Sequence, residues 1–546
     1  MEENRRAIGS TPGVSTNSKS SIPLDLEPEP DRPATKRAWP VEVVGAVLAL
    51  FIAIAVVSHL ADSDRSVLLY RDGDSLLTVL VAHSISAGQP QDWAMSSVLF
   101  LPEIAVYWLL SLLNQPVMVT LTINAVVNFL TLYASIRYVA GNDRSSSAAV
   151  TGSLLAFSTF GALALLESSS DRNGLELASL MATTTYYSAT VVGVVLTLGV
   201  MRRIADRPRH RVLSRIALLT AISALSTLTN PIYLAWAAVP LTVLIVVLAF
   251  AKRLDRRAAY QVLSGLLGGA ILGLIGRLPL TDMIANTGVG YVRPSEWRYS
   301  ADYYFALLEA RAQSLEGVVA LIVVIVLVSI AMGCTVAAFR RRAAGATLLA
   351  SASWFGPLAI LVGALGLGTH ASRYLQPALF MPILALVLIP SLLPKHVTSP
   401  SRNTVALVGG IVAVGLSAAA LISTPRLIEN VTSQESDPSL KCVTDWVNSS
   451  ERVGGGQFWT IRAPKAYIEN PRQLVQVDEY LNPYHWLVNR ADDLRGGVSF
   501  LVTDGHSYAF DLPMETFDSQ AKVISCGNYT ITDFGKGELE LGQPHS

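Results

Sequence analysis

The segment Leu68-Leu69-Tyr70-Arg71-Asp72-Gly73-Asp74-Ser75 follows the first long apolar run of the chain, residues 41–61. It places two carboxylates and a guanidinium beside the end of a run that is long enough to span a bilayer. Charged, turn-forming residues of this kind also make ordinary solvated loops. Because most of the chain from here to about residue 423 is apolar, we expect a loop at a membrane surface, where a membrane enzyme would hold its base.

The composition is typical of a protein that crosses the membrane many times. Of the 546 residues, 51% are hydrophobic and only 15% are charged, and the mean hydropathy is +0.43. Globular domains usually carry about a quarter of charged residues. The 41 basic and 41 acidic residues balance, so the net charge does not indicate a nucleic-acid partner. Three cysteines are too few for a disulfide-dense or cysteine-rich zinc scaffold.

The expected organisation is a tail, a transmembrane domain and a soluble domain. Residues 1–38 are rich in Ser, Pro, Glu and Arg without apolar periodicity, which predicts a disordered cytoplasmic tail. A cleaved signal peptide is not expected, because the first apolar run comes late and is long enough to span. Residues 39–423 form the predicted transmembrane domain and residues 424–546 the predicted extracytoplasmic domain.

Twelve apolar stretches are candidate spans. They lie at about 41–61, 97–113, 117–139, 147–166, 182–201, 215–230, 231–251, 259–280, 317–339, 346–368, 377–394 and 404–423. Clusters of Lys and Arg mark cytoplasmic connections at 202–215, 252–257, 340–342 and 395–402.

These basic connections test whether the spans alternate across the membrane. From Arg202 onward the alternation is consistent and leaves the C-terminus outside, with residues 281–316 as an outer loop. Five spans before Arg202 would put its basic connection outside, against the positive-inside rule. One early candidate is therefore wrong, or an extra half-span lies at about 75–88 or 170–182, and we expect about twelve spans.

The first outer segment, residues 62–96, carries two of the candidate catalytic acids, Asp72 and Asp74. Its apolar part is about as long as a helix that lies on the membrane surface. The next span opens with Glu103, and an acid at this depth is costly unless it is satisfied or used. The alternative for Glu103 is a position at headgroup level, paired with an arginine.

The other outer segments carry arginines beside aromatic residues. Arg293 and Arg298 lie in the loop 281–316, and Arg373 and Tyr374 lie in a corner between two spans. Guanidinium groups bind phosphate bidentately, and aromatic faces suit both sugars and the membrane interface. An aromatic belt with ordinary anchoring charges gives the same pattern.

These outer motifs resemble those of the multi-spanning C-type (GT-C) glycosyltransferases, which take sugar from a polyprenyl-phosphate carrier on the outer face of the membrane. The resemblance rests on Asp72-Gly73-Asp74-Ser75, on Pro102-Glu103 and on Arg373-Tyr374-Leu375-Gln376-Pro377, and it covers roughly residues 40–423 in architecture. The family often has Asp where this chain has Glu103. The nearest resemblance is to uncharacterised bacterial membrane proteins of this type.

The resemblance implies a function and a set of roles. Asp74 is the expected general base, with Asp72 and then Glu103 as further catalytic candidates. The donor phosphate is expected at Arg373 and Tyr374, with the two arginines of loop 281–316 as weaker candidates. The implied reaction is an inverting hexosyl or pentosyl transfer to a glycan, lipid or protein acceptor of the cell envelope. Some enzymes of this type use a divalent cation, although no His/Asp cluster here demands a cofactor.

The segment 424–546 changes character and predicts a small α/β or mostly β domain. Cys442 and Cys526 lie in it on the expected oxidising side, so they are candidates for a disulfide, with two free cysteines as the alternative. A role in acceptor or carbohydrate binding is expected of this domain, and no residue in it indicates catalysis.

Three other functional interpretations remain open. A transporter or flippase would also have about twelve spans, but it would keep its charges near the midplane and often in repeated halves. We find no clear repeat, and the acids cluster at the outer face. A ligase or polymerase of lipid-linked glycans would differ mainly in donor and acceptor, and a non-catalytic scaffold is the remaining alternative.

Overall fold

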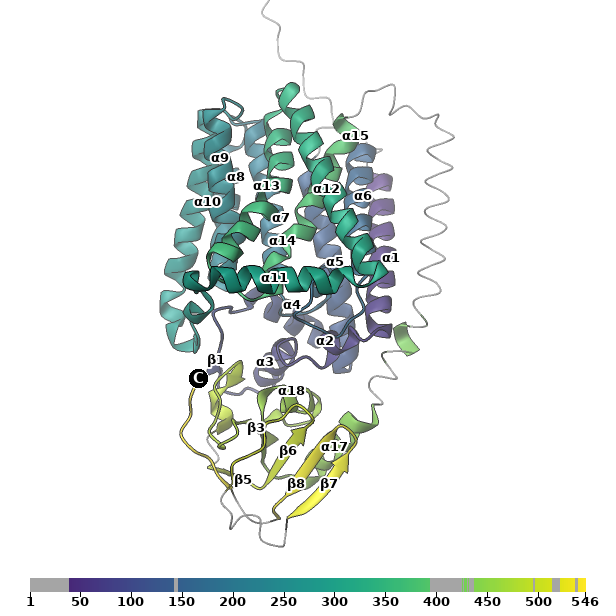
Figure 1. Ribbon diagram of the computed structural model, residues 1–546, viewed down its shortest axis with the longest axis vertical. Helices are drawn as coiled ribbons and strands as arrows, with labels where there is room; N and C mark the ends of the chain where they lie inside the picture. The colour runs from purple at the N-terminus through teal and green to yellow at the C-terminus, as the bar shows by residue number, and fades with distance from the viewer. Residues whose placement is uncertain are drawn as a thin grey trace, which may run out of the picture.

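The computed structural model describes residues 39–141, 146–392, 425, 427–429, 431, 437–493, 496–512, 521–535 and 539–546. A bundle of long helices stands on a small domain built from the C-terminal part of the chain (Figure 1). The predicted tail at 1–38 and the candidate span at 404–423 lie outside the described residues.

Within the described residues, nine helical segments are long and apolar enough to cross a bilayer, so the chain is a multi-pass membrane protein. They are α1 (Trp39–Asp62), α5 (Val117–Ala140), α6 (Ser146–Ala164), α7 (Ser188–Asp206), α8 (Val212–Thr229), α10 (Arg256–Gly276), α12 (Leu315–Arg340), α13 (Ala344–Gly366) and the segment Ser372–Leu392. The last segment consists of η6 (Ser372–Leu375), α14 (Pro377–Phe380), η7 (Pro382–Leu388) and α15 (Ile389–Leu392). Prolines break it because they lack the amide donor that a continuous helix needs.

The structure shows which early candidate span is wrong. The stretch predicted at 97–113 is the helix α4 (Leu101–Ser111), and its 11 residues are too few for the roughly 20 that a span needs. Glu42 in the first turn of α1 pairs with Arg137 in the last turn of α5, so these two ends share a face. Without α4, the helices α1, α5, α6 and α7 alternate and bring the 202–215 connection to that same face.

The basic connections at 202–215, 252–257 and 340–342 lie together at the end of the bundle away from the C-terminal domain, and the one at 395–402 lies outside the described residues. Arg202 donates to the last turn of α5 at 2.7 Å, and Arg253 donates to the Phe339 carbonyl at 3.4 Å. The backbone of Gly345 donates to the Asp206 carboxylate at 3.0 Å. The stretch predicted at 231–251 passes between the two faces as η2 (Leu234–Ala238) and α9 (Val239–Phe250).

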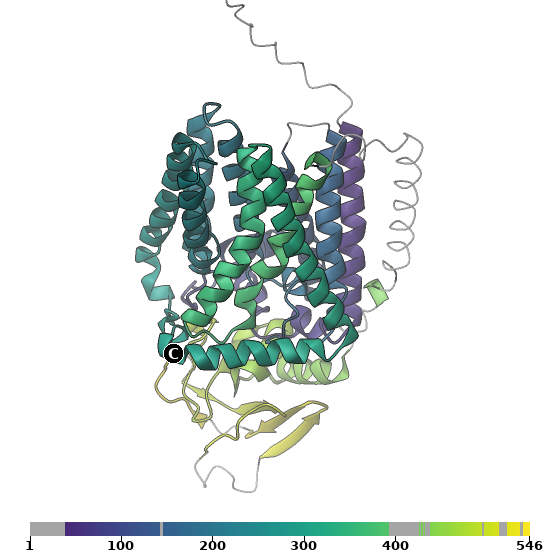
Figure 2. The same cartoon turned by 45° about the horizontal axis from the view of Figure 1, so that its top comes forward.

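The opposite end of the bundle, which we call the domain-side face, carries the three outer segments. The backbone amide of Met95 donates to Met283 at 2.6 Å, and that of Arg293 donates to Leu367 at 2.8 Å. Short elements fill this face: α2 (Ser66–Tyr70), α3 (Leu77–Ser86), β1 (Trp93–Ala94), η1 (Ser179–Ala182), η3 (Leu278–Met283), η4 (Val289–Tyr291) and η5 (Pro294–Glu296). The helix α11 (Trp297–Ala312) lies across the lower end of the spans in both views (Figures 1 and 2).

The C-terminal domain is α/β. Its elements are α17 (Pro438–Ser450), β2 (Gly454–Gly456), α18 (Phe458–Tyr467), η8 (Pro471–Gln473), β3 (Leu474–Gln476), β4 (Val488–Asn489), η9 (Arg490–Asp493), β5 (Gly497–Val498), β6 (Phe500–Asp504), β7 (Lys522–Cys526), β8 (Tyr529–Asp533) and β9 (Leu539–Glu540). The sheet order is β3-β2-β6-β8-β7, with β3, β2 and β6 parallel and the β6-β8-β7 edge antiparallel. A disulfide between Cys442 and Cys526 ties α17 to the edge strand β7.

A strand pair joins the two parts of the molecule. β1, from the loop after α1, runs antiparallel to β4 of the domain, with Trp93 opposite Asn489. Beside this pair, Arg490 forms an ion pair with Asp92 at 2.8 Å. The domain is therefore docked on the membrane loop that carries the two candidate acids.

Candidate active site

The turn Asp72-Gly73-Asp74 links α2 to α3 on the domain-side face. The Asp72 carbonyl accepts the Leu76 amide, and the Asp74 carbonyl accepts the Leu77 amide, each at 3.1 Å, so the turn begins α3. A Cβ on Gly73 would lie 2.9 Å from the Phe458 ring and 3.1 Å from the Trp459 ring. Only glycine therefore lets the turn lie this close to α18 of the C-terminal domain.

The Asp72 carboxylate is buried and held by a tyrosine. It is 5% exposed, and the Tyr186 hydroxyl lies 3.0 and 3.1 Å from its two oxygens, to which it donates. Arg172 lies 3.8 Å away. Burial, and then the negative charge of Asp74, raise the pKa of Asp72 to about 7, against the opposing effect of Arg172 and of the tyrosine hydrogen bond.

The Asp74 carboxylate, unlike that of Asp72, has no hydrogen-bond or ion-pair partner among the described residues. Burial raises its pKa, while the charges of Arg373, Arg172 and Arg462 lower it. A carboxylate without a partner, and with a raised pKa, suits a general base near neutral pH.

The sequence analysis expected Arg373 and Asp74 on one side of the membrane, and in the structure they lie close enough for the charge of Arg373 to lower the pKa of Asp74. Arg373 lies in η6, its Nε donates to the Tyr187 hydroxyl at 3.2 Å, and its guanidinium lies 6.0 Å from the Tyr186 ring centroid. The corner is anchored by Trp236, whose Nε1 donates to the Tyr374 carbonyl at 3.0 Å.

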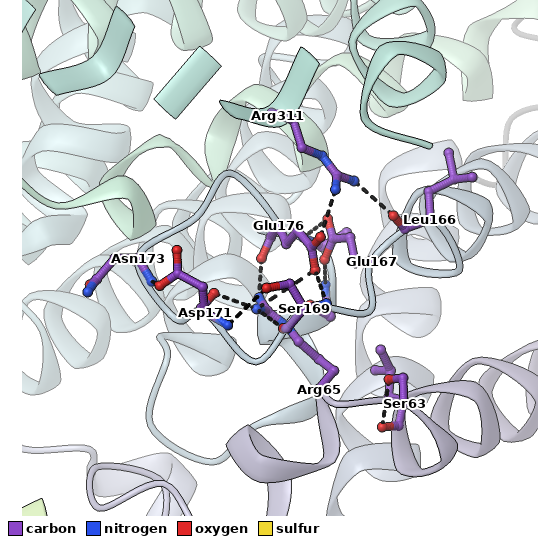
Figure 3. A network of polar contacts seen from close by, with 12 residues as sticks. Ser63, Arg65, Leu166, Glu167, Ser169, Asp171, Asn173, Glu176 and Arg311 are labelled. Carbon is purple, nitrogen blue, oxygen red and sulfur yellow. Dashed lines mark hydrogen bonds and ion pairs between the residues drawn. The ribbon is translucent and has the colours of Figure 1, made fainter. Parts of the chain in front are cut away.

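The connection between α6 and α7 carries Arg172 and Tyr186, and a buried network fixes its shape (Figure 3). Arg65, 1% exposed, donates to the carbonyls of Ser169 and Asp171 at 2.9 and 2.7 Å. It also donates to the Ser179 hydroxyl and to the Glu176 carbonyl. The Glu176 carboxylate accepts from Arg311 of α11 at 2.7 Å. The network therefore links the end of α1, this connection and α11.

An apolar cavity of about 530 Å³ lies between the spans next to this cluster. Tyr187, Tyr291 and Tyr374 line its end at the domain-side face. The rest of its lining is mostly apolar and includes Trp236, Val239, Val243, Phe355, Ile360 and Gly363. Val239 and Val243 are 62% and 47% exposed, so the cavity reaches the lipid-facing surface of the bundle.

The structure does not bring the other predicted residues to this cluster. Glu103 accepts the Ala189 amide at 3.2 Å and lines a separate cavity of about 210 Å³. Its second oxygen, Oε2, is buried without a partner among the described residues. Arg293 pairs with Glu296 at 3.2 Å on the surface, and Arg298 is exposed beside Trp297.

Sequence reasoning missed four members of the cluster: Arg172, Tyr186, Tyr187 and Arg462. The two tyrosines fell inside a stretch predicted as a span at 182–201, whereas α7 begins only at Ser188. The Thr184 hydroxyl donates to the Ser75 carbonyl there, so the segment before α7 packs on the acidic turn. The sequence signal that could have revealed this is the aromatic pair directly before Ser188, inside an otherwise apolar stretch.

The donor set does not fit a divalent cation. Both Asp72 oxygens accept the Tyr186 hydroxyl, and Arg172, Arg373 and Arg462 supply positive charge around the two acids. Hard divalent cations prefer several free oxygen ligands and are repelled by neighbouring guanidinium groups. Among the residues that the structure describes, no three side chains of His, Cys, Asp or Glu gather at metal-binding distances.

Comparison with known proteins identifies no family. No family model matches the sequence, and no curated protein matches it. Among solved structures, the apo crystal structure of the Archaeoglobus fulgidus oligosaccharyltransferase is similar, with a TM-score of 0.43 and 13% sequence identity, over 86% of this chain and 70% of that one. A TM-score below 0.5 is too low to establish a shared fold.

Proposed function

We propose that this protein is a membrane glycosyltransferase of the GT-C type, which moves a sugar from a polyprenyl-phosphate carrier to a glycan, lipid or protein acceptor of the cell envelope. The observation that carries the proposal is the position of the unpartnered Asp74 carboxylate. It lies in the field of Arg373, whose guanidinium bonds a tyrosine of the membrane-embedded cavity.

The cavity supports a lipid-linked donor. Its apolar lining and its opening toward lipid suit an isoprenoid chain, which can enter from the bilayer without exposing apolar surface to water. Tyr187 and Tyr374 mark the end where a phosphate would meet Arg373. Guanidinium is the side chain best suited to bind phosphate through two hydrogen bonds.

The chemistry is a single displacement at the anomeric carbon. Asp74 takes the proton from the acceptor hydroxyl while its oxygen forms the new bond to the anomeric carbon. The bond from that carbon to the phosphate oxygen breaks, and polyprenyl phosphate leaves with the electron pair, stabilised by Arg373. One displacement inverts the configuration of the sugar, whether a hexose or a pentose.

The proposed orientation follows from the charges at the two ends of the bundle. The basic connections that the structure describes gather at the end opposite the C-terminal domain, which the positive-inside rule assigns to the cytoplasm. The site and the domain are then on the outer side, where the disulfide Cys442–Cys526 is stable.

The test is complementation of a strain of the source organism that lacks the gene. Wild-type protein, Asp74→Asn and Asp282→Asn are expressed to equal levels in the membrane, and envelope glycans and glycolipids are analysed by mass spectrometry. Asp282 is the control because it is an exposed acid on the same face. We expect the deletion to remove one glycan, wild type and Asp282→Asn to restore it, and Asp74→Asn to lower it at least about 100-fold, the usual contribution of a general base.

The outcomes separate the function from the residue. If the deletion changes no envelope glycan or glycolipid, the glycosyltransferase proposal is wrong and a transporter or scaffold takes its place. If Asp74→Asn restores the glycan fully, the function stands and Asp74 is not its base.

A further inference from the structure

The C-terminal domain places one buried arginine against the acidic turn. Arg462 lies on α18 and is 0% exposed. Its Nε donates to the Gly73 carbonyl at 3.1 Å, and its Nη1 donates to the Leu487 carbonyl at 2.8 Å. The third nitrogen, Nη2, is buried and has no hydrogen-bond partner in the described part of the chain.

A buried guanidinium is costly unless negative charge compensates it. Burial lowers the pKa of Arg462 to about 10, while Asp74, Asp72 and Asp492 act in the opposite direction. Asp492 is already paired with Lys465 at 2.7 Å. The acid pair of the membrane loop is therefore the negative charge left to balance Arg462.

The packing around Arg462 leaves the turn little freedom. A Cβ on Gly73 would lie 3.2 Å from the Arg462 side chain, in addition to its contacts with the two aromatic residues that precede it on α18. One of these, Trp459, stacks under Arg172, whose guanidinium carbon lies 3.5 Å from the ring centroid. The turn and α18 therefore form one packed unit.

Further contacts fix α18 on the membrane domain. The Tyr467 hydroxyl, at the end of α18, donates to the Tyr70 carbonyl at 2.7 Å. Arg71, next to the turn, forms an ion pair with Asp437 at 2.6 Å. Together with the β1–β4 pair, these contacts hold the domain on both sides of the acidic turn.

Resting on the proposed function, we propose that Arg462 is a positioning residue of the active site. It holds the turn Asp72-Gly73-Asp74 against the C-terminal domain and places a buried positive charge beside the two acids. The domain then completes the active site, a role that differs from the separate acceptor-binding domain that the sequence predicts.

The positive charge of Arg462 distinguishes this role from a purely structural one, because a residue that only packs would not change the pKa of Asp74. Its positive charge lowers the pKa of Asp74, so removing the charge must raise it. The other charged or titratable groups that face Asp74 are Asp72, Arg172, Tyr186, Tyr291, Arg373 and Tyr484. They stay in place in a variant of Arg462 alone, so the shift isolates this one charge.

The test follows the protonation of Asp74 without any sugar substrate. Dicyclohexylcarbodiimide, which reacts with protonated carboxyl groups, is applied to the purified full-length protein over a range of pH. Labelling at Asp74 is separated from that at Asp72 by peptide fragmentation. The variants are Arg462→Gln, which removes the charge, Arg462→Lys, which keeps it, and Arg452→Gln, a control on the far side of the domain paired with Asp533.

We expect the midpoint of labelling at Asp74 to move to higher pH by about one unit in Arg462→Gln, as removal of a nearby opposite charge does. Arg462→Lys and Arg452→Gln should keep the wild-type midpoint. Docking is checked in each variant by a cysteine pair, Asp92→Cys with Arg490→Cys, which replaces a hydrogen-bonded cross-strand pair of suitable spacing.

An unchanged midpoint in Arg462→Gln with the cysteine pair still formed overturns the proposal. Equal shifts in Arg462→Gln and Arg462→Lys overturn it as well, because the charge would then be irrelevant. Both results leave the glycosyltransferase proposal untouched, since that stands or falls on the glycan lost with Asp74→Asn. If the C-terminal domain does not dock in Arg462→Gln, the test rests on Arg462→Lys. A docked Arg462→Lys protein whose midpoint of labelling at Asp74 differs from that of wild type contradicts the proposal.

Discussion

At the scale of single residues, the site is a pair of acids in a small volume of low polarity. Asp72 and Asp74 are separated by one glycine, so their charges repel, and burial adds to the cost of ionising both. Guanidinium groups from three separate parts of the chain offset this cost. The acid whose carboxylate has no partner is the one that we assign as base.

The raised pKa of Asp72 predicts a pH dependence of stability. Its pKa rises from 3.8 to about 7 in the folded protein, so the folded state binds the proton more tightly than the unfolded state. The stabilisation is therefore complete below the unfolded pKa and is lost as the pH rises through about 7. Asp72→Asn, which stays neutral, should lose less thermal stability than wild type between about pH 5 and about pH 8. Thermal unfolding in detergent checks this, and parallel losses in the two proteins would contradict it.

At the scale of elements, the connection between α6 and α7 depends on Arg65 for its shape. The side chain satisfies carbonyl and hydroxyl groups from four residues of the connection, and its counter-charge, Glu176, is shared with Arg311 (Figure 3). Because Arg172 and Tyr186 belong to this connection, its stability controls the geometry of the acids.

Replacing Arg65 by Met should therefore destabilise the protein far more than replacing an exposed arginine. We expect a loss of about 3–5 kcal/mol, because the change removes one of the charges that balance the buried Glu176 carboxylate and takes a donor from four oxygens of the connection. Arg65→Lys should lose less, and Arg209→Met, at an exposed position, should lose less than about 1 kcal/mol. Unfolding of the purified proteins measures this, and similar losses at both positions would show that the network is not the support.

At the scale of the whole molecule, the membrane bundle supplies the cavity, and the C-terminal domain packs against the acidic turn beside it. Gly363 of α13 lines the cavity, and a Cβ added there would meet nothing within 4 Å. A larger residue at this position therefore has room to begin its side chain and would take up part of the cavity volume.

Gly363→Leu should therefore weaken binding of a photoreactive polyprenyl phosphate by roughly tenfold or more, the effect of blocking a few methylene contacts. Gly333→Leu is the matched control, since it is the same change on α12, also in open space, at a residue outside the cavity lining. Cross-linking yield as a function of lipid concentration gives both affinities. Equal affinities in the two variants would remove the cavity from the proposed donor site.

Several features were determined by the sequence alone. Apolar runs and basic clusters are local properties, so they predicted a multi-pass protein and the grouping of the outer segments on one face. The acidic turn and Arg373 were predicted from residue type and expected side, and they lie in one electrostatic cluster. Hydropathy could not distinguish the short helix α4 from a span. The stretch 97–113 is apolar throughout, but only 11 of its residues are helical, and hydropathy does not show where a helix begins and ends.

Only the tertiary structure decided which residues surround the acids. Arg172 comes from a loop without a motif, Tyr186 from a stretch predicted as a span, and Arg462 from a domain in which no residue indicated catalysis. Glu103, which the motif placed with the acids, lies instead in a separate cavity. The physical reason is that long-range neighbours are chosen by packing and by charge balance over the whole fold, and a single sequence encodes neither in its local pattern.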